Sequence, residues 1–256
     1  MKGLQTITKI RVAGFFMLLF FQQGHTQPIQ TEKFHAVTVG ASSLSVTDSY
    51  IDLNLKGTRA GSLGYSFSAA SPYRKKSISV SWKNARVDGF ELNDIRAEYA
   101  AAFSVIKNKD SRFNTYLGYS INTNPVFITK TQEAKQYSWM TSTSLSAYGS
   151  SVYAWKNNTI SFDVSIPVAG FATRPENASG YGANMNELLY ESYNNLFFTS
   201  FHNLKAALLS VQYARGISKW INMQTGYQYS YKQLDENDGF RQVSHGLWAG
   251  FSYRLK

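Results

Sequence analysis

The chain has 256 residues, a formal net charge of +10, and 17 tyrosine and 17 phenylalanine residues. It contains no cysteine, which excludes disulfide bonds, thiolate metal sites, a cysteine nucleophile and a lipid anchor on cysteine. Its basic residues are scattered along the chain, so the positive charge does not indicate a nucleic-acid partner.

The first predicted element is a cleaved signal peptide at residues 1–26. Basic residues precede an apolar run from Val12 to Phe21, and polar residues follow it. This run is shorter than the ~20 residues of a membrane-spanning helix, and its layout is that of a secretory signal. We therefore expect export, cleavage near Gln27 and one mature domain over residues 27–256. The alternative is a buried helix.

Segments in which apolar and polar residues alternate follow the signal. In "INMQTGYQYSY", Ile221, Met223 and Tyr227 alternate with amides and small residues, which predicts a strand with two unlike faces. Each such segment is long enough to cross a bilayer as a tilted strand, which takes about 9 to 11 residues. The predicted strands are 34–45, 58–71, 75–88, 93–107, 111–128, 137–155, 157–170, 198–215, 217–233 and 240–256.

The connections and the polar faces predict how these strands assemble. The connections after the second, fourth, sixth and eighth strands are short, whereas those after the first, fifth, seventh and ninth are longer, and the one after the third is brief. Sorting of this kind is typical of outer-membrane barrels. The polar face of the second and third strands is small and uncharged, which suits a barrel interior. It consists of Ser62, Gly64, Ser66, Ser68, Ser77, Ser79 and Ser81.

The predicted fold is therefore an all-β, antiparallel, up-and-down transmembrane barrel of about ten strands, with eight or twelve as alternatives. Backbone groups in hydrocarbon must be paired, so we expect the first strand, near Val37 and Val39, to pair with the last, near Phe251 and Tyr253.

Two finer predictions concern strand register. We expect Tyr65 to oppose Trp82, and Trp82 to oppose Tyr99, so that one apolar face continues over three strands. In the sixth strand the apolar face has to change sides before the next hairpin, which predicts a β-bulge at Gly149. The alternative is that this segment contains two elements.

A few charged residues are predicted to point into the barrel. In the expected register Lys83 opposes Glu98, and Arg96 and Asp163 share the same interior. Ten strands enclose little more space than eight, whose interior side chains nearly fill. We therefore expect ion pairs that plug the lumen. A channel lined by these charges is the alternative.

Ser200 and His202 are the candidate catalytic residues, as nucleophile and base, with Glu191 orienting the imidazole. Residues two apart on a strand are about 6 to 7 Å apart at Cα, so direct contact requires the side chains to lean together. The alternative is a pair of polar residues at the barrel rim. The sequence has no metal-ligand spacing and no phosphate-binding glycine loop, so neither a metal nor another cofactor is expected.

The longest connection, residues 171–197, contains apolar residues at helical spacing. This spacing predicts a short amphipathic helix that plugs the barrel mouth, lies on the outer leaflet or contacts a partner protein. The contact residues are Met185, Leu188, Leu189, Tyr193 and Leu196.

Five stretches of the chain carry a further resemblance, and they are "GSLGYSFSAASP", "SRFNTYLGYSINTN", "ISFDVSIPVAGFATRP", "FFTSFHNLKAALLSVQYARGISKWINMQTGYQYSY" and "GLWAGFSYRLK". Together they resemble a family of uncharacterised outer-membrane β-barrel proteins from Bacteroidota-type bacteria. The resemblance implies the barrel fold and a bacterial outer-membrane location, and it assigns no site residues. Gly250, Tyr253 and Leu255 also resemble the C-terminal signal that the barrel-assembly machinery recognises during insertion, whereas Lys256 stands where many such barrels end in an aromatic residue.

The sequence thus predicts an integral outer-membrane protein with a plugged lumen. We expect it to be a structural or accessory subunit of a larger envelope complex, in contact with outer-membrane lipid. An envelope-lipid acyl hydrolase that uses Ser200 and His202, and a narrow channel for small solutes, are the alternative functions.

Overall fold

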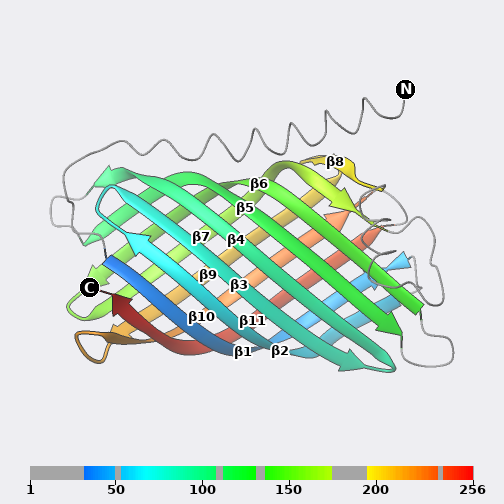
Figure 1. Cartoon of the computed structure of the whole chain (residues 1–256), viewed down its shortest axis with the longest axis horizontal. Coiled ribbons are helices and arrows are strands. Elements are labelled where there is room, and N and C mark those ends of the chain that lie inside the picture. Colours follow the sequence, from blue (N-terminus) through cyan, green and yellow to red (C-terminus); the bar gives the residue numbers. More distant parts are fainter. Residues whose placement is uncertain are drawn as a thin grey trace. The chain divides into compact units, whose positions relative to one another are not determined.

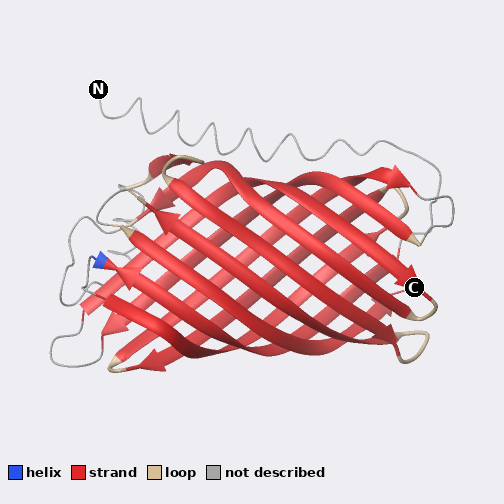
Figure 2. Ribbon diagram, turned by 180° about the vertical axis from the view of Figure 1, so that it is seen from behind, coloured by secondary structure: helices blue, strands red, loops and turns tan. Residues whose placement is uncertain are grey.

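The computed structural model describes residues 32–49, 53–107, 112–130, 136–174, 195–235 and 239–255. Almost all of this part of the chain is β-strand (Figure 2). The strands are β1 (Glu32–Asp48), β2 (Leu53–Ala70), β3 (Arg74–Val87), β4 (Phe90–Lys107), β5 (Phe113–Lys130), β6 (Gln136–Trp155), β7 (Asn158–Thr173), β8 (Phe197–Ser200), β9 (Leu204–Gly216), β10 (Ile221–Leu234) and β11 (Phe240–Leu255). Among the described residues, no helix is long and apolar enough to cross a membrane.

The strands form one closed antiparallel barrel. Strands that are consecutive in the sequence pair with one another, except that β8 and β9 both pair with β7 and not with each other, and β1 pairs with β11 to complete the ring. Val37 lies opposite Phe251 and His35 opposite Tyr253, which confirms the predicted closure. Strands of the near and far walls cross in Figure 1, because all of them are tilted, as closure of a barrel requires.

The ring has ten positions, although it contains eleven strands. β7 pairs with β8 over Ala169–Ala172 and with β9 over Asn158–Ser165, so β8 and β9 follow one another along the same side of β7. A turn at residues 201–203 separates them. The segment predicted as one strand at 198–215 is therefore two strands, and the predicted barrel of about ten strands is confirmed.

The predicted hairpin registers are wrong, although the predicted faces are right. Tyr65 lies opposite Val80, and Trp82 lies opposite Leu63 and Ile95. The β3–β4 turn consists of Asp88 and Gly89 alone, both with positive φ, as in the tight turns that match strand twist. Because each shift in register is an even number of residues, the same side chains still point outward.

The β-bulge predicted at Gly149 is not there. Lys156 and Asn157 form a two-residue turn that places Tyr153 opposite Ile160, so β6 keeps one outward face without a bulge. The irregularity lies instead in β7, where Leu145 pairs with Ala169 but Ser146 pairs with Pro167. Proline cannot donate a ladder hydrogen bond, which favours a bulge at this position.

The two ends of the barrel differ less than predicted. We call the end that carries the connections 49–52, 88–89, 131–135, 174–196 and 235–239 the loop end, and the opposite end, where β1 begins and β11 finishes, the termini end (Figure 1). Most connections at the loop end are short, because the strands extend further than their alternation indicates. The predicted sorting of loop length is therefore wrong except for residues 174–196.

Candidate functional site

The outer surface of the barrel is a continuous apolar face. Its large hydrophobic side chains project away from the interior and stay exposed in the isolated chain, far beyond the patch that a monomeric soluble protein shows. An apolar outer face around a polar and small-residue interior is the construction of a membrane-spanning barrel. The protein is an integral outer-membrane β-barrel protein. Outward residues include Val37, Val39, Leu63, Val80, Trp82, Phe103, Phe162, Val211, Met223, Tyr227, Leu247 and Phe251.

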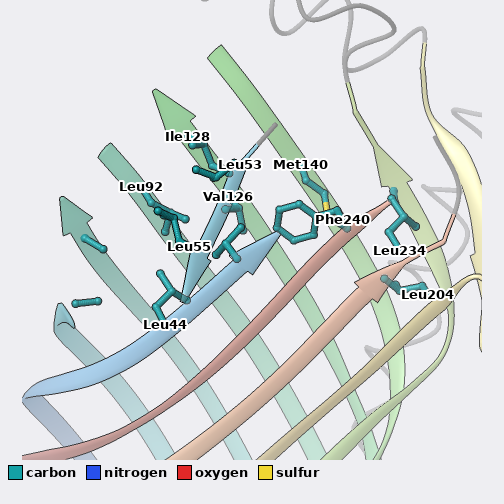
Figure 3. Close-up of a cluster of buried hydrophobic side chains, with 14 residues drawn as sticks. Leu44, Leu53, Leu55, Leu92, Val126, Ile128, Met140, Leu204, Leu234 and Phe240 are labelled. Carbon is teal, nitrogen blue, oxygen red and sulfur yellow. The ribbon is translucent and has the colours of Figure 1, made fainter. Parts of the chain in front are cut away.

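The interior of the loop end is filled by an apolar cluster. Figure 3 shows its side chains projecting into the interior from strands in different parts of the barrel. All of them are buried, and the partly buried side chains of Val87, Phe90 and Phe197 pack against them. The cluster consists of Leu44, Val46, Leu53, Leu55, Ala60, Ala85, Leu92, Val126, Ile128, Met140, Ala172, Leu204, Leu234 and Phe240.

A buried ion pair accompanies this cluster. Nη2 of Arg174 lies 2.6 Å from Oδ1 of Asp48, and Ser138 donates a hydrogen bond of 2.7 Å to the other oxygen of that carboxylate. The Arg174 guanidinium also lies over the Phe240 ring, 5.6 Å from its centroid. Asp48 and Ser138 belong to β1 and β6, which are not neighbours in the wall, so these contacts span the lumen.

Below the apolar cluster lies a central polar layer, which consists of Lys83, Asp94, Asn124, Lys232, Gln242 and Ser244. All six side chains are buried. Lys83 donates to Ser244 at 2.9 Å, from β3 to β11. Asp94 accepts hydrogen bonds from Asn124 at 2.6 Å and from Gln242 at 2.8 Å. Lys232 of β10 donates to Asn124 of β5 at 3.1 Å, so hydrogen bonds cross the lumen in this layer as well.

A second charged group lies nearer the termini end. Nζ of Lys75 is 2.7 Å from Oδ1 of Asp163 and 2.8 Å from Oγ of Ser150. The Tyr148 hydroxyl donates to the same Asp163 oxygen at 2.6 Å. Lys75 and Asp163 belong to β3 and β7, so this ion pair also bridges opposite walls.

Inward-facing polar residues between these groups are only half-buried. An inward side chain with exposed surface borders interior space that a water molecule can enter. The loop-end half of the interior is thus apolar and packed, whereas the other half has half-buried polar residues together with a second, smaller buried cluster of Ala100, Ala102, Tyr116 and Tyr148. The half-buried inward residues include Ser62, Ser66, Ser68, Ser77, Ser79, Ser81, Arg96, Glu98 and Asn122.

The structure separates the predicted interior charges. Lys83 lies opposite Asp94, and Glu98 lies opposite Ser79, so the predicted juxtaposition of Lys83 with Glu98 is wrong. The cause is the tight β3–β4 turn, which moves the register by four residues relative to the predicted one. Asp163 pairs with Lys75, a residue that the prediction did not include.

Ser200 and His202 do not share a strand face. Ser200 is the last residue of β8, and His202 lies in the exposed turn that follows. The contact between them runs from the His202 backbone N–H to the Ser200 hydroxyl at 3.5 Å. The predicted geometry is wrong because the strand ends between the two residues. Glu191 lies outside the described residues.

Asn203 holds this turn in place. Its Oδ1 atom accepts a hydrogen bond of 2.7 Å from the Ser200 backbone, and its carbonyl accepts one of 3.1 Å from the backbone of Asp235. Asp235 in turn accepts a hydrogen bond from Lys205, and chiefly this contact lowers the pKa of its carboxyl group. These contacts give the turn a structural role at the rim.

The predicted contact loop is described only at its end. Leu196 is exposed beside β8. Met185, Leu188, Leu189 and Tyr193 lie outside the described residues, as does the predicted signal peptide.

Sequence reasoning missed five of the charged residues that the interior holds, namely Lys75, Asp94, Lys232, Asp48 and Arg174. Lys75 has the same parity as Lys83, and Asp94 the same parity as Arg96, so the alternation itself places both of them inside. The alternation does not predict which residue pairs with each charge, because those partners lie across the lumen.

No family model matches the chain, and no curated protein matches it. Solved structures of outer-membrane barrels are similar to it. Neisserial surface protein A matches at 12% identity over 87% of this chain and 97% of that chain, with a TM-score of 0.41. The outer membrane protease OmpT from Escherichia coli matches at 5% identity over 91% and 99%, with a TM-score of 0.48. The translocator domain of the autotransporter NalP from Neisseria meningitidis matches at 7% identity over 99% and 97%, with a TM-score of 0.43. At sequence identities this low, the similarity concerns the fold alone.

Proposed function

We propose that this protein is a non-conducting outer-membrane barrel that serves as a structural or accessory subunit of an envelope assembly. The observation that carries the proposal is the filled interior of the loop end. A barrel whose lumen is packed with side chains offers no path for a solute, so its contribution to the envelope has to come from its surfaces.

The apolar cluster is the main barrier to conduction. An ion that crossed it would lose its hydration shell among side chains such as Leu44, Val126 and Leu234, which are wholly buried and provide no replacement ligands. The hydrogen bonds of the central polar layer and the Asp48–Arg174 ion pair add two further crossings of the lumen. Opening a channel would require all of these contacts to break together.

The rim beside β8 is the surface that we assign to a partner. Phe198 and Phe201 are exposed there, Leu196 lies next to them in the chain, and the ring of Phe198 meets that of Phe171 edge-on. Outer-membrane barrels carry their longer loops on the outside of the cell, so we place this rim there. Exposed aromatic residues are typical anchors of protein interfaces.

Co-purification from native membrane in mild detergent tests the proposal. We expect a larger envelope component to co-purify in stoichiometric amount with the wild-type barrel, and to be lost when Phe198 and Phe201 are both replaced by alanine. Phe103→Ala is the matched control, because Phe103 is equally exposed but lies at the termini end. Recovery of the barrel alone, with wild type and variants indistinguishable, contradicts the accessory role.

Conductance in planar bilayers tests the filled lumen separately. We expect the purified barrel to add no unitary conductance to the bilayer at any voltage that the bilayer tolerates. Reproducible single-channel steps from the wild-type protein would replace the proposal with a narrow channel for small solutes.

A further inference from the structure

The central polar layer contains two buried ammonium groups that contact only neutral acceptors. Lys83 and Lys232 are each 7% exposed. Nζ of Lys83 donates to the Ser244 hydroxyl, and Nζ of Lys232 donates to the amide oxygen and the backbone carbonyl of Asn124. An ammonium group has three N–H donors, so both groups retain hydrogen-bonding capacity beyond these contacts.

The nearby carboxylate does not pair with either lysine. Both oxygens of Asp94 accept hydrogen bonds from amides, one from Asn124 and one from Gln242. In the part of the chain that the structure describes, no carboxylate oxygen lies within 4.0 Å of Lys83 or Lys232. The two lysines and the one carboxylate of the layer therefore lie near one another without forming a direct ion pair.

Arg96 adds a third positive charge beside the layer. It follows Asp94 by two residues on the inward face of β4, and both residues act electrostatically on the two lysines, Asp94 by attraction and Arg96 by repulsion. Its Nη1 atom is enclosed and has no hydrogen-bond partner. Among the described residues, Glu98, the next inward residue of β4, forms an ion pair within 4.0 Å with none of the three cations, and it attracts Arg96 only from a longer distance.

Elsewhere in the interior, two other cations form direct ion pairs with carboxylates of this chain. Lys75 lies 2.7 Å from Asp163, and Arg174 lies 2.6 Å from Asp48. Burial of a charge without a counter-charge is strongly unfavourable. The central layer differs from the two other charged groups because its cations contact amide and hydroxyl groups and no carboxylate.

We propose that Lys83, Lys232 and Arg96 form a binding site for a small oxyanion of the phosphate class. Two compact ammonium charges and a planar guanidinium are the groups that proteins use to bind phosphate, and the enclosed Nη1 atom of Arg96 has N–H donors without a partner. The anion reaches the layer from the termini end, past the half-buried serines Ser79 and Ser81. The apolar cluster closes the loop end to it.

This site is independent of the partner surface proposed above. The anion site lies in the interior of the barrel, whereas the proposed partner surface lies on the rim. Bound anion would fasten β3, β4 and β10 to one another from within, so occupancy is expected to stabilise the folded barrel in proportion to the ligand concentration.

Titration calorimetry on the full barrel in detergent tests the site with inorganic phosphate as the probe. Glycerol 3-phosphate is titrated in a parallel arm to separate the free ion from a phosphate monoester, and HEPES at matched ionic strength is the control for screening. We expect saturable binding of phosphate with one site per barrel. The second readout is the temperature at which the folded band on gels converts to the unfolded band, which we expect to rise with phosphate and not with HEPES.

Arg96→Gln and Lys232→Met are the test variants, and Lys76→Met, an outward lysine on β3, is the matched control for net charge. A charged hydrogen bond contributes enough that loss of Arg96 should weaken phosphate binding about tenfold or more. If Lys232→Met fails to fold, Arg96→Gln still decides, because Arg96 is only half-buried and glutamine keeps an N–H donor. The proposal is overturned if the wild-type barrel shows no saturable binding, or if both test variants bind phosphate as the wild type does.

Discussion

Asp48 and Arg174 form an ion pair that is wholly enclosed inside the loop end of the barrel, with side chains 1% and 0% exposed. Removal of one partner would leave the other charge buried beside an apolar cluster. We expect Asp48→Asn to lower the free energy of unfolding by about 3 to 5 kcal/mol, because breaking a buried pair leaves an uncompensated charge. Urea unfolding of the reconstituted barrel, followed by tryptophan fluorescence, measures the change.

Asp88→Asn is the matched control for this substitution. Asp88 is exposed in the β3–β4 turn and has a positive φ that asparagine also tolerates. We expect a change within about 0.5 kcal/mol, as for most surface substitutions. Equal effects at positions 48 and 88 would contradict the structural importance of the buried pair.

The assigned lipid face can be tested with arginine. Val211 is outward near the middle of β9, between Phe162 and Tyr227, so Val211→Arg is expected to destabilise by about 2 to 4 kcal/mol. Met223 is also outward but lies near the termini end of β10, and the same change there should cost less, because the cost falls toward the membrane interface. Unfolding in lipid vesicles measures both values.

Gln212→Arg provides the comparison on the inward face of β9. This position faces the polar half of the interior, where arginine meets amide and hydroxyl groups and not hydrocarbon. If arginine is tolerated equally at 211 and 212, the assignment of faces in β9 is incorrect.

Close approach of strands makes Gly250 sensitive to a single methyl group. A Cβ atom there would fall against the carbonyl oxygen of Val37 and lie 2.9 Å from the Cα atom of Thr38. We expect Gly250→Ala to destabilise by about 1 to 3 kcal/mol through overpacking of the β1–β11 pair. Gly61→Ala, where the added methyl meets nothing within 4 Å, should leave the thermal transition on gels unchanged. A loss of stability in both variants would point to glycine content and not to this contact.

The hydrolase alternative predicts a different pattern. If Ser200 and His202 were catalytic, Ser200→Ala would abolish lipid deacylation while the folded mobility of the barrel on gels stayed the same. We expect no ester hydrolysis above that of a heat-unfolded sample, because β8 ends at Ser200 and His202 lies in the exposed turn, where its backbone N–H contacts the Ser200 hydroxyl. Hydrolysis that is lost specifically in Ser200→Ala and His202→Ala would reverse the ranking of the two functions.

The features that could be predicted from the sequence are those encoded by neighbouring residues. The outward positions of β10, such as Ile221 and Tyr227, follow from a period of two, which is local. The register of a hairpin depends on the backbone angles of its turn, and for this reason Trp82 was placed opposite the wrong residues. Contacts across the lumen are even harder to predict from the sequence. Lys75 and Asp163 are 88 positions apart, and strand tilt, not alternation, brings them together.

The pairing of β1 with β11 has a consequence for the order of folding. It joins the two ends of the described chain, where Arg254 donates a hydrogen bond to Glu32 from 222 positions away. Contacts of such long sequence separation carry the largest loop-closure entropy, so this seam is expected to form after the hairpins. Until it forms, the chain is an open sheet with two unpaired edges that can pair with any other exposed strand. The lifetime of that open sheet, and not the stability of the finished wall, then sets how long the chain needs protection from aggregation.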